Sequence, residues 1–227
     1  MKLSVIIPVL NEEATTRKIL EKVILQKTVF EIIVVNDGST DKTAEILNML
    51  KKIKRFKGKL KIINHKKNLG KGAALCTGIK KAKGECILVQ DADLEYDPKD
   101  YGRLLSYLAQ KTCVYGSRIM SGNPHAYFRT YLGNILLTSF CNVLFGGHLT
   151  DSYTCYKLIP AGIARSLKLR SRGFEIEAEI TAKLLKKKIP ITEVPIRYKP
   201  RSYEKGKKIK ARDAIKGLFT FLKVKFD

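Results

Sequence analysis

The feature that most constrains this sequence is the alternation, over its first 118 residues, of short apolar runs with longer segments of helical periodicity. The apolar runs are rich in Ile and Val, and most lack alternating polar residues, as expected for strands covered on both faces. The segments between them begin after Asn, Asp or Gly, which favour helix starts. We therefore predict a βαβαβαβαβ order, with strands at residues 3–8, 31–36, 60–64, 86–90 and 113–116 and helices at about 12–25, 41–54, 72–83 and 98–109.

This order predicts an α/β fold with a single doubly wound, mostly parallel sheet and helices on both faces. A chain of 227 residues can bury a substantial core, and no linker divides it, so we expect one domain over residues 1–227. In such sheets ligands bind at the carboxyl ends of the strands. The first four predicted strands are followed there by polar segments: PVLNEE at 8–13, NDGSTD at 36–41, NHKKNLGKG at 64–72 and DADLE at 91–95.

Asp91 and Asp93 follow the fourth predicted strand. Side chains two residues apart on an extended segment point the same way, so both carboxylates can face one ion. Mg²⁺ prefers one or two carboxylates, with substrate phosphates completing its shell, and Glu95 could supply a third carboxylate. The structural alternative is that these aspartates cap a turn or the next helix. Their position after a central strand favours a metal site.

Two acidic residues after earlier strands have alternative roles. Asp41 is placed to cap the helix that follows it, which leaves Asp37 free to hydrogen-bond a base or ribose. Glu12 can either cap the first helix or bind the nucleotide. The short run Gly70-Lys71-Gly72 has neither the spacing of a P-loop nor that of a dinucleotide-binding fingerprint, so we interpret it as close backbone approach or helix entry.

The charge distribution narrows the class of partner. Lys and Arg number 44 against 21 Asp and Glu, a formal net charge of +23. Residues 46–84 contain 13 basic and no acidic residues, and a second basic stretch covers 183–212. Such a field attracts nucleic acid, anionic lipid head groups or phosphorylated substrates, whereas the alternative is simply a solvated, lysine-rich surface.

The cysteines and the N-terminus bear on localisation. The five cysteines are scattered and have no CxxC spacing, so they indicate buried thiols in a reducing cytosol rather than disulfides or a zinc site. The sequence runs from Met1 directly into the strand-like LSVIIPV, without the regions of a secretory signal peptide. We therefore expect a cytoplasmic protein.

Two segments of the second half bear on membrane attachment. Residues 130–150 carry no charge, but Asn, Ser, Thr and three glycines interrupt the apolar run. We therefore expect a helix lying against the protein or at a membrane interface rather than a membrane span. Residues 210–227 have helical periodicity with cationic flanks, so this helix is expected to pack on the core or lie on anionic lipid. Its apolar face consists of Ala211, Ile215, Leu218, Phe219 and Leu222.

Together these segments resemble the family 2 glycosyltransferases with the GT-A fold, and in particular the polyprenyl-phosphate or dolichyl-phosphate hexose synthases. The early motifs are those of the superfamily. The later ones, YGSR at 115–118, TCYKL at 154–158, GFEIEAE at 173–179 and VPIRYKPRSYEKGKK at 194–208, point to the subgroup. The resemblance implies a nucleotide-sugar-binding half at 1–118, an acceptor half at 119–208 and an amphipathic C-terminal helix at 209–227.

The resemblance also implies a role for each candidate site residue. Contacts with the nucleotide are implied for Pro8, Leu10, Glu12, Val35, Asp37, Asp91 and Ala92. Asp91, Asp93 and Glu95 would hold Mg²⁺ or Mn²⁺ against the donor diphosphate, with Arg201 nearby. Asp93, Arg118 and Arg129 would form the catalytic group, in which the two arginines bind the acceptor phosphate. Arginine suits this role because its rigid fork of donors matches phosphate oxygens.

The expected function is inverting transfer of a hexose from a nucleotide-sugar donor to a polyprenyl or dolichyl phosphate. GDP-mannose is the favoured donor and UDP-glucose the second. The protein is expected to lie peripherally on the cytoplasmic face of a membrane, held by anionic lipid or by a membrane-anchoring protein. A phosphate with its second pKa near ~6 is already an anion at neutral pH, so its oxygen can attack the anomeric carbon without a general base.

Two alternatives remain open. The first is a family 2 enzyme that glycosylates a sugar or protein hydroxyl, which needs a carboxylate base, and Glu175 and Glu177 are the candidates. The second is a non-enzymatic basic module that binds nucleic acid or anionic membrane. The carboxylates gathered at strand ends, and the lack of a basic motif interleaved with aromatics, argue against nucleic acid as a partner.

Overall fold

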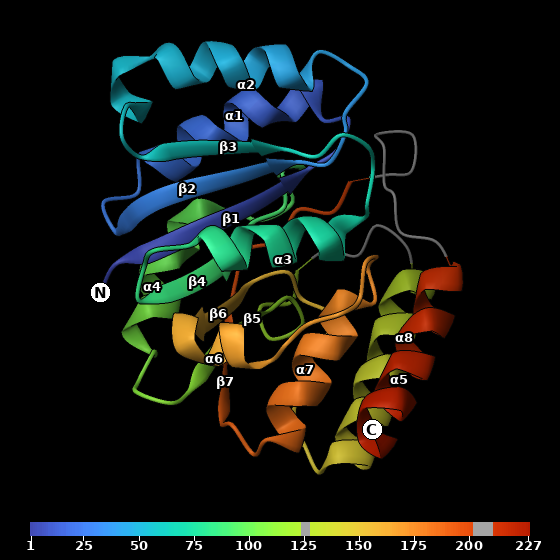
Figure 1. Ribbon diagram of the computed structural model, residues 1–227. Helices are drawn as coiled ribbons and strands as arrows, with labels where there is room; N and C mark the ends of the chain where they lie inside the picture. The colour runs from blue at the N-terminus through green and yellow to red at the C-terminus, as the bar shows by residue number, and fades with distance from the viewer. Residues whose placement is uncertain (124–127, 202–210) are drawn as a thin grey trace.

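Among the residues that the computed structural model describes, seven strands form one sheet, and Figure 1 shows helices flanking it. The structure describes residues 1–123, 128–201 and 211–227. The strands are β1 (Leu3–Val9), β2 (Val29–Asn36), β3 (Leu60–Asn64), β4 (Cys86–Val89), β5 (Cys113–Ser117), β6 (Lys157–Pro160) and β7 (Ile191–Pro195). The helices are α1 (Glu13–Ile24), α2 (Thr43–Lys52), α3 (Lys71–Lys81), α4 (Tyr101–Ser106), α5 (Phe128–Phe145), α6 (Ala161–Ser166), α7 (Ile176–Lys186) and α8 (Ala211–Phe226), with 3₁₀ turns η1 (Lys54–Phe56) and η2 (Pro98–Asp100).

The sheet is mixed, with the strand order β3-β2-β1-β4-β6-β5-β7. β1 lies parallel to β2 and β4, β2 to β3, and β5 to β7. β6 is antiparallel to both of its neighbours, β4 and β5. The α/β class, the single sheet and its parallel part agree with the prediction, whereas β6 and β7 lie in the irregular second half, where no strand was predicted.

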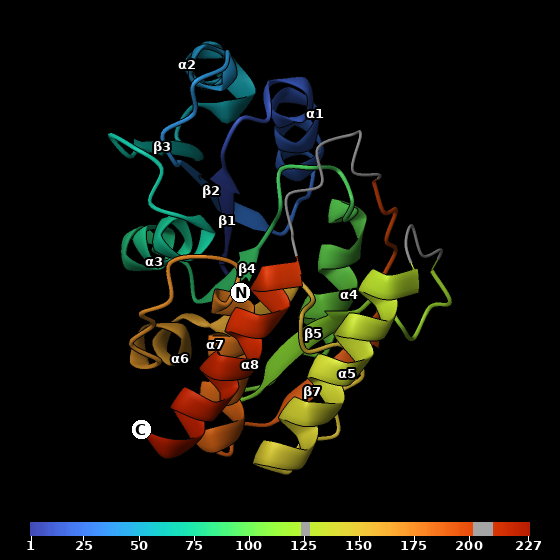
Figure 2. The same ribbon diagram turned by 90° about the vertical axis from the view of Figure 1, so that its right-hand side faces the viewer.

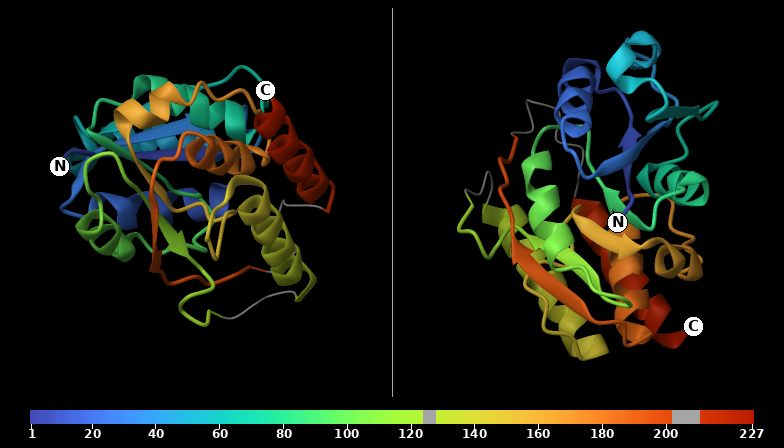
Figure 3. Two further views of the ribbon diagram at one scale, coloured as in Figure 1. Left: turned by 90° about the horizontal axis from the view of Figure 1, so that it is seen from below. Right: turned by 90° about the vertical axis from the view of Figure 1, so that its left-hand side faces the viewer.

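Helices cover both faces of the sheet. Figures 2 and 3 show α3 and α6 on one face and α1 and α4 on the other. The strand residues of β1, β2 and β4 are almost all buried, which explains why their sequences are continuously apolar. The first four strands lie within two residues of their predicted ends.

The predicted helix at 98–109 is shorter than expected. Its first turn is η2, where the Asp97 carboxylate accepts a hydrogen bond from the backbone N–H of Lys99. The α-helix that follows ends at Ser106. Beyond it, the N–H groups of Tyr107 and Leu108 donate to carbonyls three residues earlier, a tightening typical of helix ends.

α5, α7 and α8 pack around a second apolar cluster. Its buried members are Leu137, Cys141, Ala178, Ala182, Phe221 and Val224. α5 and α8 lie side by side in Figures 1 and 2. The first of the two positions expected for the 130–150 segment, a helix against the protein, agrees with the structure up to the end of α5 at Phe145. Within the described ranges, no helix has both the length and the apolar character needed to cross a membrane.

The apolar face predicted for α8 does not pack on the core. Ile215 is 55% exposed and Phe219 is 67% exposed, and Leu218 and Leu222 are also exposed. Contact with the protein is made instead by the opposite side of the helix, through Gly217, Phe221 and Val224. The helix therefore has two apolar sides, one of which faces solvent.

Candidate active site

Acidic residues that follow β1, β2 and β4 meet at the carboxyl edge of the sheet, as the sequence predicted. β1 lies between β2 and β4, so the chain order reverses here, and such a switch point is where open α/β sheets bind ligands. Arg201 joins two of these segments. Its Nη2 lies 3.0 Å from Glu12 Oε1 and 3.5 Å from Asp93 Oδ2.

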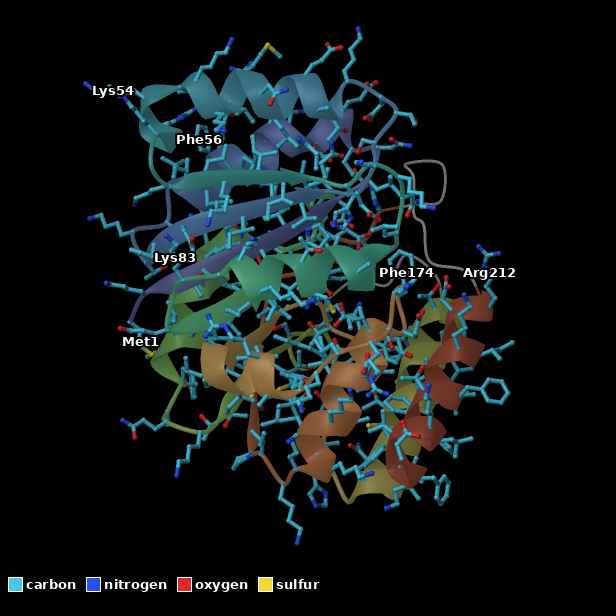
Figure 4. All side chains as sticks on the ribbon, in the orientation of Figure 1. Met1, Lys54, Phe56, Lys83, Phe174 and Arg212 are labelled. Atoms are coloured by element: carbon cyan, nitrogen blue, oxygen red, sulfur yellow. The ribbon has the colours of Figure 1, made fainter. Side chains whose placement is uncertain are left out.

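Figure 4 locates the site along the molecule. Phe174 lies at the side toward which β1, β2 and β3 run, and its ring centroid is 5.8 Å from the Nζ of Lys71. Lys54 and Lys83, two members of the first basic stretch, project from the opposite side. The stretch is therefore spread over the molecule, since Lys71 lies at the site and Lys54 and Lys83 do not.

The segment that carries Asp91 and Asp93 is a turn, not the extended strand that was predicted. β4 ends at Val89, and Leu94 has a φ of 65°. The Asp93 Oδ1 accepts a hydrogen bond from the N–H of Glu95 at 3.1 Å, which closes the turn locally. The two aspartates come together because of this turn rather than through the alternation of a strand.

Asp91 pairs with Lys71, a residue to which the sequence assigned no charge partner. Their Nζ–Oδ1 distance is 2.8 Å, and the same Nζ lies 3.2 Å from Glu177 Oε1. Burial acts to lower the pKa of Lys71, but the carboxylates outweigh it and raise that pKa well above its usual value. Burial acts to raise the pKa of Asp91, yet the Lys71 ammonium holds it below the usual range. The signal that could have identified Lys71 is its place at the start of the helix after β3, on the same sheet edge.

Asp93 is electrostatically different from Asp91. Burial raises its pKa to about 7, and the charges of Asp91 and Glu95 add to this effect against the opposing charge of Arg201. A carboxylate destabilised by its acidic neighbours is a position where an added cation is favourable. Asp91 and Asp93 therefore fit the one or two carboxylates that Mg²⁺ or Mn²⁺ takes beside substrate phosphates.

The Glu95 carboxylate accepts hydrogen bonds within the protein, and its role as a third metal ligand stays a prediction. Its Oε2 accepts a hydrogen bond from the Tyr198 hydroxyl at 2.7 Å, and its Oε1 accepts one from the backbone N–H of Arg201 at 2.8 Å. In the described part of the chain no group of three His, Cys, Asp or Glu is arranged to hold a metal ion. Glu95 instead ties the turn after β4 to the segment that carries Arg201.

Arg118 is held by a buried aspartate. Asp151 Oδ2 accepts hydrogen bonds from the backbone N–H of Arg118 at 3.0 Å and from its Nε at 2.7 Å, and Oδ1 accepts one from Nη2 at 2.7 Å. The guanidinium carbon lies 5.3 Å from the ring centroid of Tyr198, whose hydroxyl reaches Glu95. One tyrosine therefore separates Arg118 from the turn after β4. Arg129 lies in α5, but its side chain is outside the described residues.

Asp37 is not free, which corrects the sequence interpretation. Its Oδ1 lies 2.7 Å from His65 Nδ1 and accepts a hydrogen bond from the N–H of Leu69, and its Oδ2 accepts one from the N–H of Gly70. The side chain is almost fully buried. Asp37 therefore anchors the loop that leads into α3, and its contact with a nucleoside stays a prediction. Asp41 accepts the N–H of Thr43 at the start of α2, but the N-cap position is Lys42, so Asp41 lies one residue before the cap that was predicted for it.

The other residues predicted to contact the nucleotide lie near this edge. Pro8 pairs in register with Val35 near the ends of β1 and β2. The Val35 side chain is fully buried, so contact with a ligand by that side chain is excluded in this arrangement. Leu10 follows β1 and is partly buried, and Ala92 is 4% exposed in the turn after β4.

Gly70 and Gly72 lie where another loop approaches the start of α3. Gly70 has a φ of 99°, and a Cβ atom there would collide with the carbonyl oxygen of Arg172. A Cβ at Gly72 would collide with the carbonyl oxygen of Ser171. The N–H of Gly72 donates to the Arg172 carbonyl at 2.7 Å. Close backbone approach, one of the two roles predicted for this run, is confirmed.

The chain matches the family model described as glycosyl transferase family 2 over residues 4–167. A dolichyl-phosphate beta-glucosyltransferase from Trichomonas vaginalis is 27% identical over 241 residues, covering 97% of this chain and 72% of that protein. A dolichol-phosphate mannosyltransferase from Pyrococcus furiosus is 29% identical, covering 92% of this chain and 61% of that protein. The chain spans 49% of the low-salt glycan biosynthesis hexosyltransferase Agl6 from Haloferax volcanii, which is 29% identical over 89% of this chain.

Solved structures share the architecture. Glucosyl-3-phosphoglycerate synthase from Mycobacterium tuberculosis, in complex with Mn²⁺, UDP and glucosyl-3-phosphoglycerate, superposes with a TM-score of 0.72 at 16% identity, over 98% of this chain and 79% of that chain. The same enzyme with Mg²⁺ and UDP gives a TM-score of 0.70. At such low identity the likeness shows the fold alone, which is the predicted GT-A fold. Because the family model matches most of the sequence, the chain belongs to glycosyl transferase family 2.

Proposed function

We propose that this protein transfers a hexose from a nucleotide-sugar donor to a polyprenyl or dolichyl phosphate, with inversion at the anomeric carbon. The observation that carries the proposal is the meeting of Glu12, Asp93 and Arg201 at the switch point of a family 2 glycosyltransferase sheet. The names of the relatives from Trichomonas and Pyrococcus, which specify dolichyl-phosphate glucosyl and dolichol-phosphate mannosyl transfer, support this acceptor class.

The donor diphosphate binds beside the turn after β4. Asp91 and Asp93 would hold Mg²⁺ or Mn²⁺ there, and a bound divalent ion would stabilise the charge that grows on the departing diphosphate. Arg201 is fixed by Glu12 and Asp93, so its guanidinium stays on the donor side of the site. Structures of the mycobacterial synthase with Mn²⁺ or Mg²⁺ and UDP support a divalent ion for this fold.

The acceptor phosphate binds near Arg118, with Arg129 as its second expected contact. An acceptor that is already anionic needs no general base, so the two candidate bases, Glu175 and Glu177, would have other roles. Glu177 lies between Lys71 and Lys157 and is 4% exposed. Glu175 accepts the N–H of Gly173 with one carboxylate oxygen. Because each of these carboxylates keeps one oxygen without a hydrogen-bond partner among the described residues, the preference for a phosphate acceptor is supported by the names of the relatives and not by these contacts.

The place of action is the cytoplasmic face of an anionic membrane. The solvent-facing side of α8 presents Ile215, Phe219 and Leu222, and Lys216 and Lys223 flank it. The neighbouring α5 exposes Leu132, Leu136 and Val143. Apolar stripes edged by lysine are suited to the boundary between head groups and acyl chains.

Vesicle flotation tests this attachment. The substitution Phe219→Glu should reduce binding to vesicles containing phosphatidylserine, because it places a carboxylate among apolar side chains and anionic lipid. Met49→Glu is the matched control, since Met49 is 59% exposed on α2 at the other end of the molecule and should leave binding unchanged. Equal binding of the two variants and the unchanged protein would show that α8 is not the docking element.

Product analysis tests the activity. The protein is incubated with GDP-mannose or UDP-glucose, a polyprenyl phosphate and Mn²⁺, and the lipid product is identified by mass spectrometry. Asp91→Ala and Asp93→Ala should abolish transfer with the fold retained, whereas Glu45→Ala, an exposed carboxylate on α2, should not. Transfer only to sugar or protein hydroxyls would overturn the lipid-phosphate acceptor. Full activity in EDTA would overturn the metal role.

A further inference from the structure

Lys71 lies between two carboxylates on different elements. Its Nζ is 2.8 Å from Asp91 Oδ1 and 3.2 Å from Glu177 Oε1. Its side chain is 14% exposed, so solvent screens these charges only weakly. The ammonium therefore occupies one of the two carboxylates that the proposed function assigns to the divalent ion.

One carboxylate oxygen of Glu177 can accept a hydrogen bond that the described contacts do not supply. Its Oε2 accepts a hydrogen bond of 2.6 Å from the fully buried Lys157. Its Oε1 is buried, faces Lys71 without hydrogen-bond geometry, and has no hydrogen-bond partner among the described residues. Buried carboxylate oxygens normally have such a partner, so this one is an unfilled acceptor beside an ammonium.

A divalent ion on Asp91 would repel the ammonium at contact distance. Two like charges about 4 Å apart interact strongly in a partly buried site. The ammonium can relieve this repulsion by moving away from Asp91. Movement toward Glu177 Oε1 is short, because the two atoms are already 3.2 Å apart.

We propose that Lys71 is a placeholder cation, which neutralises Asp91 while no metal is bound and shifts onto Glu177 when a divalent ion takes its place. Lys157 is a positioning residue in this arrangement, because it holds Glu177 Oε2 and so keeps Oε1 directed at Lys71. The inference rests on the metal role of Asp91 in the proposed function. It adds that this site has a built-in competitor for the metal.

Metal binding by the full chain without nucleotide tests the inference, with Mn²⁺ titrated and followed by electron paramagnetic resonance and calorimetry. Lys71→Met removes the competitor and should tighten Mn²⁺ binding about tenfold, which corresponds to about 1.4 kcal/mol. Glu177→Gln removes the charge that attracts the displaced ammonium and should weaken binding by a similar factor. Lys183→Met is the matched control, because it removes an ion pair with Glu179 on the same helix, outside the site, and should change nothing.

A placeholder predicts that Lys71→Met and Glu177→Gln change Mn²⁺ affinity in opposite directions, whereas a purely structural role of Lys71 does not. If Lys71 only positions Asp91, both variants will weaken Mn²⁺ binding, and the inference is overturned. Unchanged binding by either variant overturns it as well. Thermal denaturation covers the risk that Lys71→Met folds poorly, because a placeholder predicts low stability in EDTA and a larger gain on adding Mn²⁺ than in the unchanged protein.

Asp91→Asn distinguishes a failure of the metal role of Asp91 from a failure of the placeholder role of Lys71. It should abolish Mn²⁺ binding in the unchanged and Lys71→Met backgrounds. Persistence of Mn²⁺ binding would overturn the metal role of Asp91, and the placeholder with it. Loss of Mn²⁺ binding by Asp91→Asn, together with weaker binding by Lys71→Met, would overturn the placeholder alone.

Discussion

Removal of the Asp151 carboxylate should cost more stability than any exposed ion pair. Asp151 is fully buried and accepts four hydrogen bonds, three from Arg118 and one from the Asn134 amide. Asp151→Ala would leave a largely buried guanidinium without its counter-charge. Breaking one side of a buried pair costs about 3–5 kcal/mol. A protein of this size loses about 2–4 °C in Tm per kcal/mol, so the expected fall is roughly 6–20 °C.

Differential scanning fluorimetry and urea unfolding measure this loss. The control is Glu21→Ala, which removes exposed pairs with Arg17 and Arg55 and should cost less than about 1 kcal/mol. An unchanged urea m-value would show that the change lies in native stability. Adding Arg118→Ala to Asp151→Ala should recover part of the loss, because no unpaired cation then remains buried. A loss for Asp151→Ala no larger than that of the control would refute the reasoning.

Three further predictions concern other parts of the molecule. Gly70→Ala should destabilise by at least about 2 kcal/mol in urea unfolding, since it combines a positive φ with a collision against Arg172, whereas Gly58→Ala has a positive φ in open space and should cost only about 1–2 kcal/mol. The pKa of Asp93 is raised to about 7, so the metal-free fold binds an extra proton between pH 3.8 and about 7. Because the folded protein holds this proton more tightly than the unfolded chain does, the free energy of unfolding should fall as pH rises through that window. Mn²⁺ affinity should rise up to about pH 7 and then level off, since the proton competes with the ion. Calorimetry that shows no pH dependence of Mn²⁺ binding would contradict this prediction. Of the five thiols only Cys76 is partly exposed, so a thiol reagent should label at most one cysteine natively and all five in denaturant, and rapid native labelling of several would exclude this packing.

The sequence was sufficient to predict the parallel half of the sheet. Its apolar runs without alternating polar residues indicate strands covered on both faces. Because the carboxyl ends of parallel strands meet at one edge of the sheet, Glu12, Asp91 and Asp93 could be placed at that edge. β6 was missed because its sequence, KLIP, begins with lysine, ends with proline and leads directly into α6, so it lacks the continuous apolar run by which the equally short β4 was predicted. The sequence left open whether the apolar face of α8 packs on the core, because an apolar stripe in a sequence does not tell whether protein or solvent covers it.

The sequence also did not predict which charged residues pair with each other in the site. Lys71 and Asp91 are twenty positions apart, Arg118 and Asp151 thirty-three, and nothing in spacing alone selects one lysine or aspartate among many. These pairs depend on which loops the folded sheet brings together. The same reason explains Asp37, whose carboxylate is used by the backbone of the loop before α3.

The contact between Glu12 and Arg201 joins residues 189 positions apart in the chain. During synthesis from the N-terminus, β1–β4 are made first, whereas β5 pairs with β6 and β7, strands that come later in the chain. The acidic residues Glu12, Asp91 and Asp93 are therefore synthesised well before Arg201. The guanidinium that pairs with Glu12 is therefore the last part of this cluster to be synthesised, and a chain interrupted before residue 201 would lack it.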